Sequence, residues 1–209
     1  MITLGVVGGI GSGKTFVTDL FCELDSTYKI STDDLLHELI EHPDIQAQLR
    51  NRWKLCGMIS NMGSNDRITR HQISRIIFGD GDNKPIESEL KFVESITLMP
   101  LKAMILDKLF FYDNKMTRMV VLDAALLFEA ELDDICDKTL FVSAPIDLRV
   151  RRAGSRPVGK VLTRTELENR EKLQISLSEK KGYCDLTILN DEDAEVTRRQ
   201  VKKIWEDLI

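Results

Sequence analysis

Gly8-Gly-Ile-Gly-Ser-Gly-Lys-Thr15 is the stretch of sequence that decides the fold. It fits the pattern G-x-x-x-x-G-K-S/T, which is the Walker A motif. The apolar, β-branched run from 2 to 8 predicts a buried strand of a parallel sheet. Apolar residues recur at helical spacing between 13 and 24, which predicts a helix. The motif therefore lies between a strand and a helix, which is the context that it requires.

This loop is suited to holding the phosphate groups of a nucleotide. Glycines let backbone N–H groups approach phosphate oxygens without a Cβ in the way, and the following helix adds a partial positive charge at its N-terminus. We expect Lys14 to reach the β- and γ-phosphates and the Thr15 hydroxyl to bind Mg²⁺. A glycine-rich turn without a ligand is the alternative, but it leaves Lys14 unexplained. The predicted nucleotide-binding residues of the loop are Gly9, Gly11, Ser12, Gly13, Lys14 and Thr15.

Strand and helix signals alternate along the rest of the chain. We predict strands at 28–30, 119–123, 139–143 and 185–190, and helices at 33–40 and 194–208. The patterns between 43 and 113 are helical, most clearly at 68–78 and 86–109, and Pro100 is expected to kink or end the second of these helices. Strands separated by helices predict an α/β fold with a parallel sheet, into which the helical middle is inserted.

Composition and charge exclude several classes of protein. The chain has 209 residues, 43% of them hydrophobic, and a formal net charge of −5. Mild acidity argues against a broad nucleic-acid or membrane surface, and no apolar run is long enough to span a membrane. The four cysteines form no C-x-x-C pair, so small buried thiols in a reducing compartment are the simplest interpretation. We expect a cytoplasmic protein that binds neither nucleic acid nor membranes, and the sequence leaves its oligomeric state open.

A basic stretch between 149 and 170 stands out in a chain that is acidic overall. Phosphoryl transfer needs cations on the migrating group, and a mobile arginine lid can deliver them while excluding water. Arg152 and Arg156 are four residues apart and share one face if the segment is helical, so we predict that these two contact the phosphates. A solvated, charged helix face is the alternative for most of the stretch.

Carboxylates follow two of the predicted strands, at the edge where open α/β sheets bind ligands. Asp33 and Asp34 come after the second strand, and a carboxylate there could accept a proton from a substrate hydroxyl. Capping of the next helix explains both residues equally well. Asp123 ends the third strand and could hold Mg²⁺ directly or through water, although a buried capping role competes with that interpretation.

In their order along the chain, these motifs resemble those of the dephospho-CoA kinase family, and the likeness runs from Ile2 to about Trp205. The glycine-rich loop looks like that family's version. Ile30-Ser-Thr-Asp33 falls where the family has Ile-Asp-Ala-Asp, which places Asp33 on the family's proposed general base. Asp123-Ala-Ala-Leu-Leu-Phe-Glu129 looks like Asp-x-Pro-Leu-Leu-Phe-Glu. The remaining matches are Cys56-Gly57, Gly63, Asp66-Arg67, Ile77-Phe78, Arg152 with Arg156, Arg170 with Gln174, and Asp185 with Asn190.

The resemblance implies a protein of three parts. These are a P-loop core of about 1–43, 114–146 and 175–209, a helical substrate domain of about 44–113, and an arginine lid of about 147–174. The implied reaction transfers the γ-phosphoryl group of ATP, with Mg²⁺, to the ribose 3′-hydroxyl of dephospho-CoA, in the last step of coenzyme A biosynthesis. Asp33 would then contact the acceptor and Asn190 would lie at the nucleotide.

The sequence departs from the family's pattern mainly on the acceptor side. Met99-Pro100 stands where the family has His-Pro, Ser31 replaces an Asp, and Ala125 replaces a Pro. Methionine supplies neither the hydrogen bonds nor the charge of an imidazole, so acceptor recognition could be weakened, altered or rebuilt. The residues that could rebuild it are Arg67, His71, Arg75 and Lys91. Two alternatives therefore stay open: a related P-loop kinase with another small-molecule or nucleotide acceptor, and an ATP-binding homologue that has lost transfer.

Overall fold

The computed structural model describes residues 1–59, 66–79, 86–155 and 162–209. It divides into two compact units, one of Met1–Thr32 with Leu106–Ile209 and one of Asp33–Ile105. The sheet belongs to the first unit, and the described residues of the second unit form helices joined by loops. Helix α2 begins at the last residue of the first unit's N-terminal segment, and helix α5 ends in the first unit.

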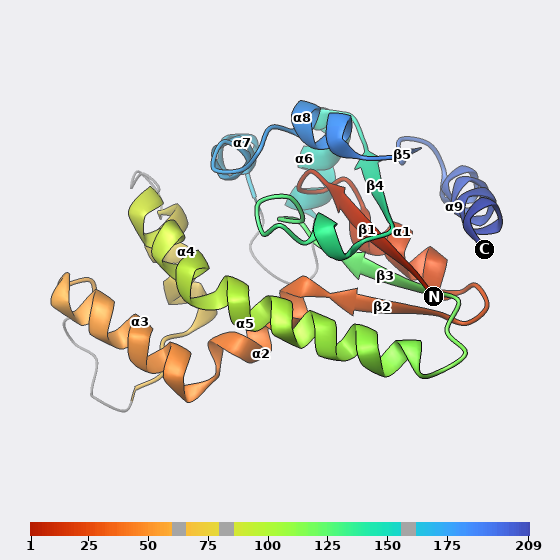
Figure 1. Ribbon diagram of the computed structural model, residues 1–209. Helices are drawn as coiled ribbons and strands as arrows, with labels where there is room; N and C mark the ends of the chain where they lie inside the picture. The colour runs from red at the N-terminus through yellow and green to blue at the C-terminus, as the bar shows by residue number, and fades with distance from the viewer. Residues whose placement is uncertain (60–65, 80–85, 156–161) are drawn as a thin grey trace. The chain divides into compact units, whose positions relative to one another are not determined.

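Five strands, all within the described residues, form one parallel sheet in the order β2-β3-β1-β4-β5 (Figure 1). The strands are β1 (Ile2–Gly8), β2 (Thr27–Ser31), β3 (Met119–Asp123), β4 (Lys138–Ser143) and β5 (Leu186–Leu189). The central strand β1 places Val6 opposite Asp123 of β3 and Gly8 opposite Val142 of β4. Because the strands run in one direction, their carboxyl ends share one edge, and the glycine-rich loop leaves β1 at that edge.

The sheet is covered on both faces, which explains the continuous apolar runs in its central strands. Val6 and Val7 are successive residues of β1 and therefore point to opposite faces of the sheet, and both are 0% exposed. Helices α1 (Lys14–Cys22) and α9 (Ala194–Leu208) contact each other and pack on this core, to which α9 contributes Val201. Helix α8 (Leu177–Tyr183) contacts β1 and β4.

The remaining elements of the first unit are the 3₁₀ helix η1 (Asp133–Ile135), α6 (Ile146–Gly154) and α7 (Arg164–Glu171). Both α7 and α8 begin with a capping box. At the start of α7, the Thr163 hydroxyl accepts the N–H of Glu166 while the Glu166 carboxylate accepts the N–H of Thr163. These reciprocal bonds satisfy backbone donors that a helix leaves unpaired at its N-terminus.

The second unit, Asp33–Ile105, contains α3 (Pro43–Leu55), α4 (Arg70–Phe78), all but the first residue of α2 (Thr32–Ile40) and the part of α5 (Glu87–Asp113) up to Ile105. Trp53 is fully buried in it and donates its Nε1–H to Glu89 at 2.8 Å. Arg52 pairs with the same buried carboxylate at 2.8 Å and holds the pKa of Glu89 below its usual range. The two donors offset the cost of burying a carboxylate among apolar side chains.

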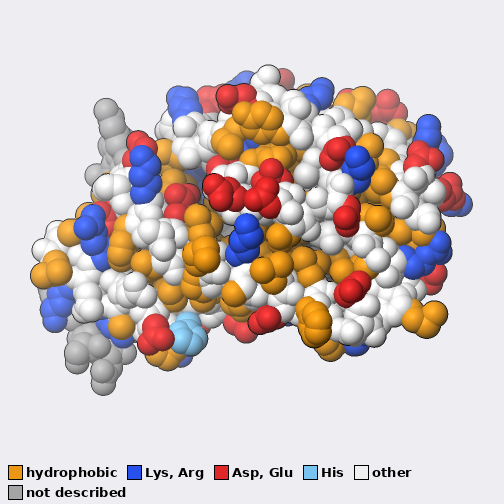
Figure 2. All heavy atoms as spheres, in the orientation of Figure 1, with side chains coloured by type: hydrophobic (Ala, Val, Ile, Leu, Met, Phe, Trp, Pro, Cys, Tyr) orange, Lys and Arg blue, Asp and Glu red, His pale blue; other side chains and the backbone are white. Residues whose placement is uncertain are grey.

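The sequence predictions of the α/β fold, the parallel sheet and its strands are confirmed. Pro100 lies inside α5, which continues to Asp113, so the helix does not end at this proline. A proline removes one hydrogen bond of the helix, but the buried neighbours Leu101 and Ile105 keep the following turn in place. Acidic and basic side chains are both spread over the face shown in Figure 2, in keeping with a net charge of only −5.

Candidate nucleotide-binding site

The glycine-rich loop has the backbone conformation that only glycine adopts without strain. Gly11 has φ of 76° and Gly13 has φ of 90°. A Cβ on Gly11 would collide with the backbone oxygen of Arg149, and a Cβ on Gly13 would collide with the Asn190 side chain. These two positions therefore require glycine for their φ angles and for the close approach of neighbouring groups.

Two of the predicted functional side chains at the start of α1 contact the ends of β1 and β3. The Lys14 ammonium donates to the backbone oxygen of Gly8 at 3.0 Å. The Thr15 hydroxyl lies 3.3 Å from an oxygen of Asp123, and the Thr18 hydroxyl lies 3.4 Å from the same oxygen. The structure thus brings together the hydroxyl and the carboxylate that were predicted to hold Mg²⁺, and oxygen ligands are the kind that this ion prefers.

Arg152 and Asn190 meet beside the loop. Arg152 donates to the backbone oxygens of Asn190 at 3.0 Å and of Ser12 at 3.3 Å. The Asn190 amide donates to the same Ser12 oxygen at 2.8 Å and accepts the Thr197 hydroxyl at 3.1 Å. Burial and the positive charge of Arg151 lower the pKa of Arg152.

Arg149 also contacts the loop, which the sequence did not predict. Its guanidinium pairs with Glu171 at 2.5 Å and donates to the backbone oxygen of Ile10 at 3.3 Å. The side chain is 8% exposed, so the solvated helix face is the wrong interpretation for this residue. Glu171 was not predicted because it occupies one of the unspecified positions between Arg170 and Gln174, to which the resemblance assigns no role.

A buried cluster centred on Lys180 joins α8 to the segment after β3. The Lys180 ammonium is fully buried and contacts Glu129 at 2.7 Å, the Ala125 backbone oxygen at 2.8 Å and Gln174 at 3.2 Å. Glu129 also accepts the N–H of Ile175 at 3.0 Å. Sequence reasoning singled out Glu129 and Gln174 through the family resemblance, but nothing in the local pattern pointed to Lys180.

Comparison with known proteins decides the family. The family model described as dephospho-CoA kinase matches residues 2–195. The chain belongs to the dephospho-CoA kinase family. A dephospho-CoA kinase of Aquifex aeolicus is 30% identical over 216 residues, which cover 100% of this chain and 98% of that protein. A dephospho-CoA kinase of Oceanobacillus iheyensis is 29% identical over 206 residues, covering 98% of this chain and 96% of that protein.

Solved structures agree on the fold. TT1252 from Thermus thermophilus matches with a TM-score of 0.72 at 25% identity, covering 100% of this chain and 98% of that one. The dephospho-CoA kinase from Campylobacter jejuni matches with a TM-score of 0.68 at 20% identity, covering 98% and 96%. A shikimate kinase from Acinetobacter baumannii, in complex with shikimate, matches with a TM-score of 0.53 at 14% identity, covering 99% and 92%. The fold is therefore that of P-loop kinases.

Asp33, which the family resemblance places at the acceptor, lies in the second unit, as do the residues that could rebuild acceptor recognition. Asp33 and Asp34 occupy the first turn of α2, where their charges favour the helix N-terminus. Arg67 pairs with Glu41 at 3.0 Å, which leaves a large part of its side chain exposed. The other two predicted residues, His71 and Arg75, are four positions apart and share one face of α4.

Other predicted features have simpler outcomes. Arg156 lies outside the described residues. Cys22, Cys56, Cys136 and Cys184 are all free thiols, and burial raises the pKa of Cys136 to about 12 and that of Cys184 to about 11. Across the described parts of the chain, no group of three or more His, Cys, Asp or Glu could hold a metal ion. No helix among those parts is long and apolar enough to cross a membrane.

Proposed function

We propose that this member of the dephospho-CoA kinase family transfers the γ-phosphoryl group of ATP to the ribose 3′-hydroxyl of dephospho-CoA. The observation that supports this proposal most strongly is the glycine-rich loop, which ends at Lys14 and is followed by Thr15, whose hydroxyl lies 3.3 Å from a carboxylate oxygen of Asp123. This arrangement stands at the carboxyl edge of a parallel sheet, in a chain whose family is named for that reaction. The proposed division into core, substrate domain and lid follows the same assignment.

In this proposal Gly9 and the loop residues from Gly11 to Thr15 hold the triphosphate. Their backbone N–H groups and the Lys14 ammonium offset the negative charge of the phosphates. Thr15 and Asp123 would hold Mg²⁺, which would neutralise charge on the phosphate oxygens. Arg152, already at the loop, would add a further cation, as would Arg156.

Asp33 is proposed to accept the proton of the acceptor. The 3′-hydroxyl oxygen would form a bond to the γ-phosphorus, the bond from that phosphorus to the β,γ-bridging oxygen would break, and ADP would leave. The hydroxyl proton would pass to the Asp33 carboxylate. Arg67, His71 and Arg75, with Lys91, are proposed to contact dephospho-CoA, since Met99 cannot replace an imidazole in that role.

The test is a coupled assay with ATP and dephospho-CoA. Lys14→Ala should lower turnover by roughly 10²-fold or more, because it removes the cation nearest the transferred group. Asp33→Asn should lower turnover severely while leaving the dissociation constant for MgATP unchanged, and Asp34→Asn is its matched control. Near-normal turnover of Asp33→Asn would remove this residue from the proposed role.

Two other outcomes would favour the alternatives. Transfer to a nucleoside monophosphate or a sugar, with none to dephospho-CoA, would indicate a kinase with another acceptor. MgATP binding without transfer to any acceptor would indicate a homologue that has lost catalysis. We also propose a cytoplasmic setting, which the four free thiols support because they suit a reducing compartment.

A further inference from the structure

One residue of the glycine-rich loop, Ile10, is held on every side by the segment that follows β4. Its N–H donates to Glu171 at 3.0 Å, and its backbone oxygen accepts from Arg149 at 3.3 Å. Its side chain packs against the apolar cluster of that segment, which includes Ala153 and Leu167. Both polar groups of the residue and its side chain are therefore fixed by α6 and α7.

The two residues that hold Ile10 also hold each other. Arg149 and Glu171 pair at 2.5 Å, and their side chains are 8% and 15% exposed. A charge that is so far removed from water needs its partner, since an unpaired buried charge is strongly unfavourable. The pair is thus a fixed unit, and the Arg149 charge is neutralised by Glu171 and not available to a phosphate.

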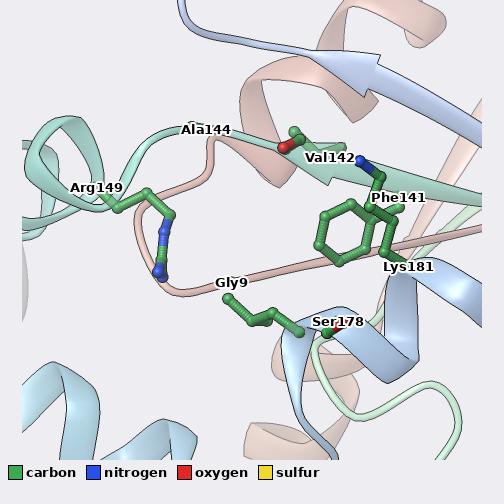
Figure 3. Close-up of a pocket in the computed structure, with 9 residues that line it drawn as sticks. Gly9, Phe141, Val142, Ala144, Arg149, Ser178 and Lys181 are labelled. Atoms are coloured by element: carbon green, nitrogen blue, oxygen red, sulfur yellow. The ribbon is translucent and has the colours of Figure 1, made fainter.

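The chain of the loop passes so close to this pair that a side chain at Gly9 would have to displace it. A Cβ on Gly9 would lie 2.6 Å from a nitrogen of Arg149 and 2.9 Å from an oxygen of Glu171. Figure 3 shows the Arg149 side chain directed from α6 toward the loop at Gly9. Arg152 lies three residues further along α6 and contacts the loop at Ser12, so one face of this helix touches the loop at two points.

We propose that Arg149 and Glu171 are positioning residues of the phosphate-binding loop: by holding both polar groups of Ile10, they set the backbone in the shape that receives the triphosphate. The inference rests on the proposed function for its ligand. A phosphate-binding loop works through N–H groups that are already aligned, so misalignment at Ile10 weakens binding at the neighbouring amides. Neither residue touches a reacting atom in this role.

The test measures the dissociation constant for MgATP by calorimetry, without acceptor, in Arg149→Met, Glu171→Gln and the double variant. Each single change should weaken MgATP binding by roughly 10- to 100-fold, which is the usual effect of losing a charged hydrogen bond. Because both residues hold the backbone of one residue, Ile10, their effects should not add, and the double variant should bind MgATP no more weakly than the single variant with the lower affinity. The KM for dephospho-CoA should stay within about twofold of the wild-type value.

Arg164→Met is the matched control. Arg164 also joins α7 to α6, through Asp147 at 2.9 Å, and it pairs within α7 with Glu168 at 3.1 Å. Its side chain is 53% exposed, and among the described residues its ion pairs do not involve the loop. This variant should bind MgATP as the wild type does. Thermal unfolding of every variant checks that MgATP binding is measured on folded protein. If Arg149→Met does not fold, the MgATP affinity of Glu171→Gln alone tests the inference.

Three results would overturn the inference. The first is wild-type affinity for MgATP in folded Glu171→Gln, and the second is an equal loss in Arg164→Met. The third is tighter binding by Glu171→Gln, which would mean that the carboxylate competes with phosphate for the Ile10 N–H. If the wild type binds MgATP but does not phosphorylate dephospho-CoA, the proposed function is refuted. The inference about Arg149 and Glu171 would still stand or fall on the MgATP dissociation constants of the variants.

Discussion

Asn190→Asp is a near-isosteric change at the contact between the loop and the segment after β5, and it should destabilise the protein strongly. Asn190 is 3% exposed, and its amide donates to the Ser12 backbone oxygen at 2.8 Å. An aspartate would place a carboxylate oxygen against that carbonyl oxygen, where the amide now supplies a donor. The volume hardly changes, so the effect measures the hydrogen bond and the charge rather than a cavity.

The expected loss follows from the contacts. The donated hydrogen bond is worth about 1 kcal/mol, and leaving a buried acceptor opposite a desolvated carboxylate costs about 2 kcal/mol more. We therefore expect the free energy of unfolding to fall by about 3 kcal/mol at pH 7. For a protein of this size that loss corresponds to a shift of about 1 M in the urea midpoint.

The dependence on pH identifies the cause. Burial and the facing Ser12 oxygen would raise the pKa of the new carboxyl in the folded state above its unfolded value of about 3.9, in opposition to the attraction of Arg152, which is already bonded to the Ser12 and Asn190 backbone oxygens. The loss of unfolding free energy relative to wild type should then be complete above the folded pKa. It should shrink as the pH falls through that pKa, because the protonated acid can donate to Ser12 again. Thr197→Val, which removes the hydroxyl bonded to Asn190 Oδ1, should cost only about 1 kcal/mol at every pH. A difference for Asn190→Asp that is independent of pH, or smaller than that of Thr197→Val, would refute this account.

Three further changes test other parts of the structure. Lys180→Met should lower the free energy of unfolding by about 3–5 kcal/mol in urea titrations, because it leaves a buried carboxylate without its cation; a loss below about 1 kcal/mol would contradict the buried pair. Gly11→Ala should weaken MgATP binding in calorimetry because its φ is 76°, whereas Gly182→Ala, with open space around it, should not. The N–H of Thr139 donates to Asp185 and holds the pKa of that carboxyl below its usual range. Asp185 therefore stabilises the folded state fully above its unfolded pKa of about 3.9, and this stabilisation is lost as the pH falls through the lower folded pKa. Asp185→Asn should therefore be less stable than wild type at pH 7 and equal to it in strong acid, and a constant difference would contradict the assignment.

The fold was largely predictable because its signals are local. The strand β1, the loop and α1 follow each other within 22 residues. The strand is marked by a continuous apolar run, the loop by the Walker A motif and the helix by apolar residues at helical spacing. The closing helix was predicted at its observed bounds, Ala194–Leu208, because its apolar residues recur at helical spacing. Of the two effects expected of Pro100, the end of the helix is ruled out, because α5 continues to Asp113.

The candidate site was predictable only where residues belong to a motif. The Walker A motif indicated Lys14 and Thr15, and the place of Asp123 at the end of a predicted strand indicated that residue. Glu171 and Lys180 were not predicted, because their roles depend on partners at distances of 161 and 55 positions along the chain. A single sequence contains no signal for such contacts, since any exposed lysine or glutamate of a helix has the same local pattern.

The state of the cysteines makes the native chain convenient for single-site labelling. Only the thiolate attacks a maleimide, and with pKa values of about 12 and about 11 the thiols of Cys136 and Cys184 hold roughly one thiolate in 10⁴ or fewer at neutral pH. Burial also raises the pKa of Cys22. Cys56 is exposed at the end of α3 and should react first. A fluorophore can therefore be attached to the second unit without introducing a new cysteine or replacing the other three cysteines.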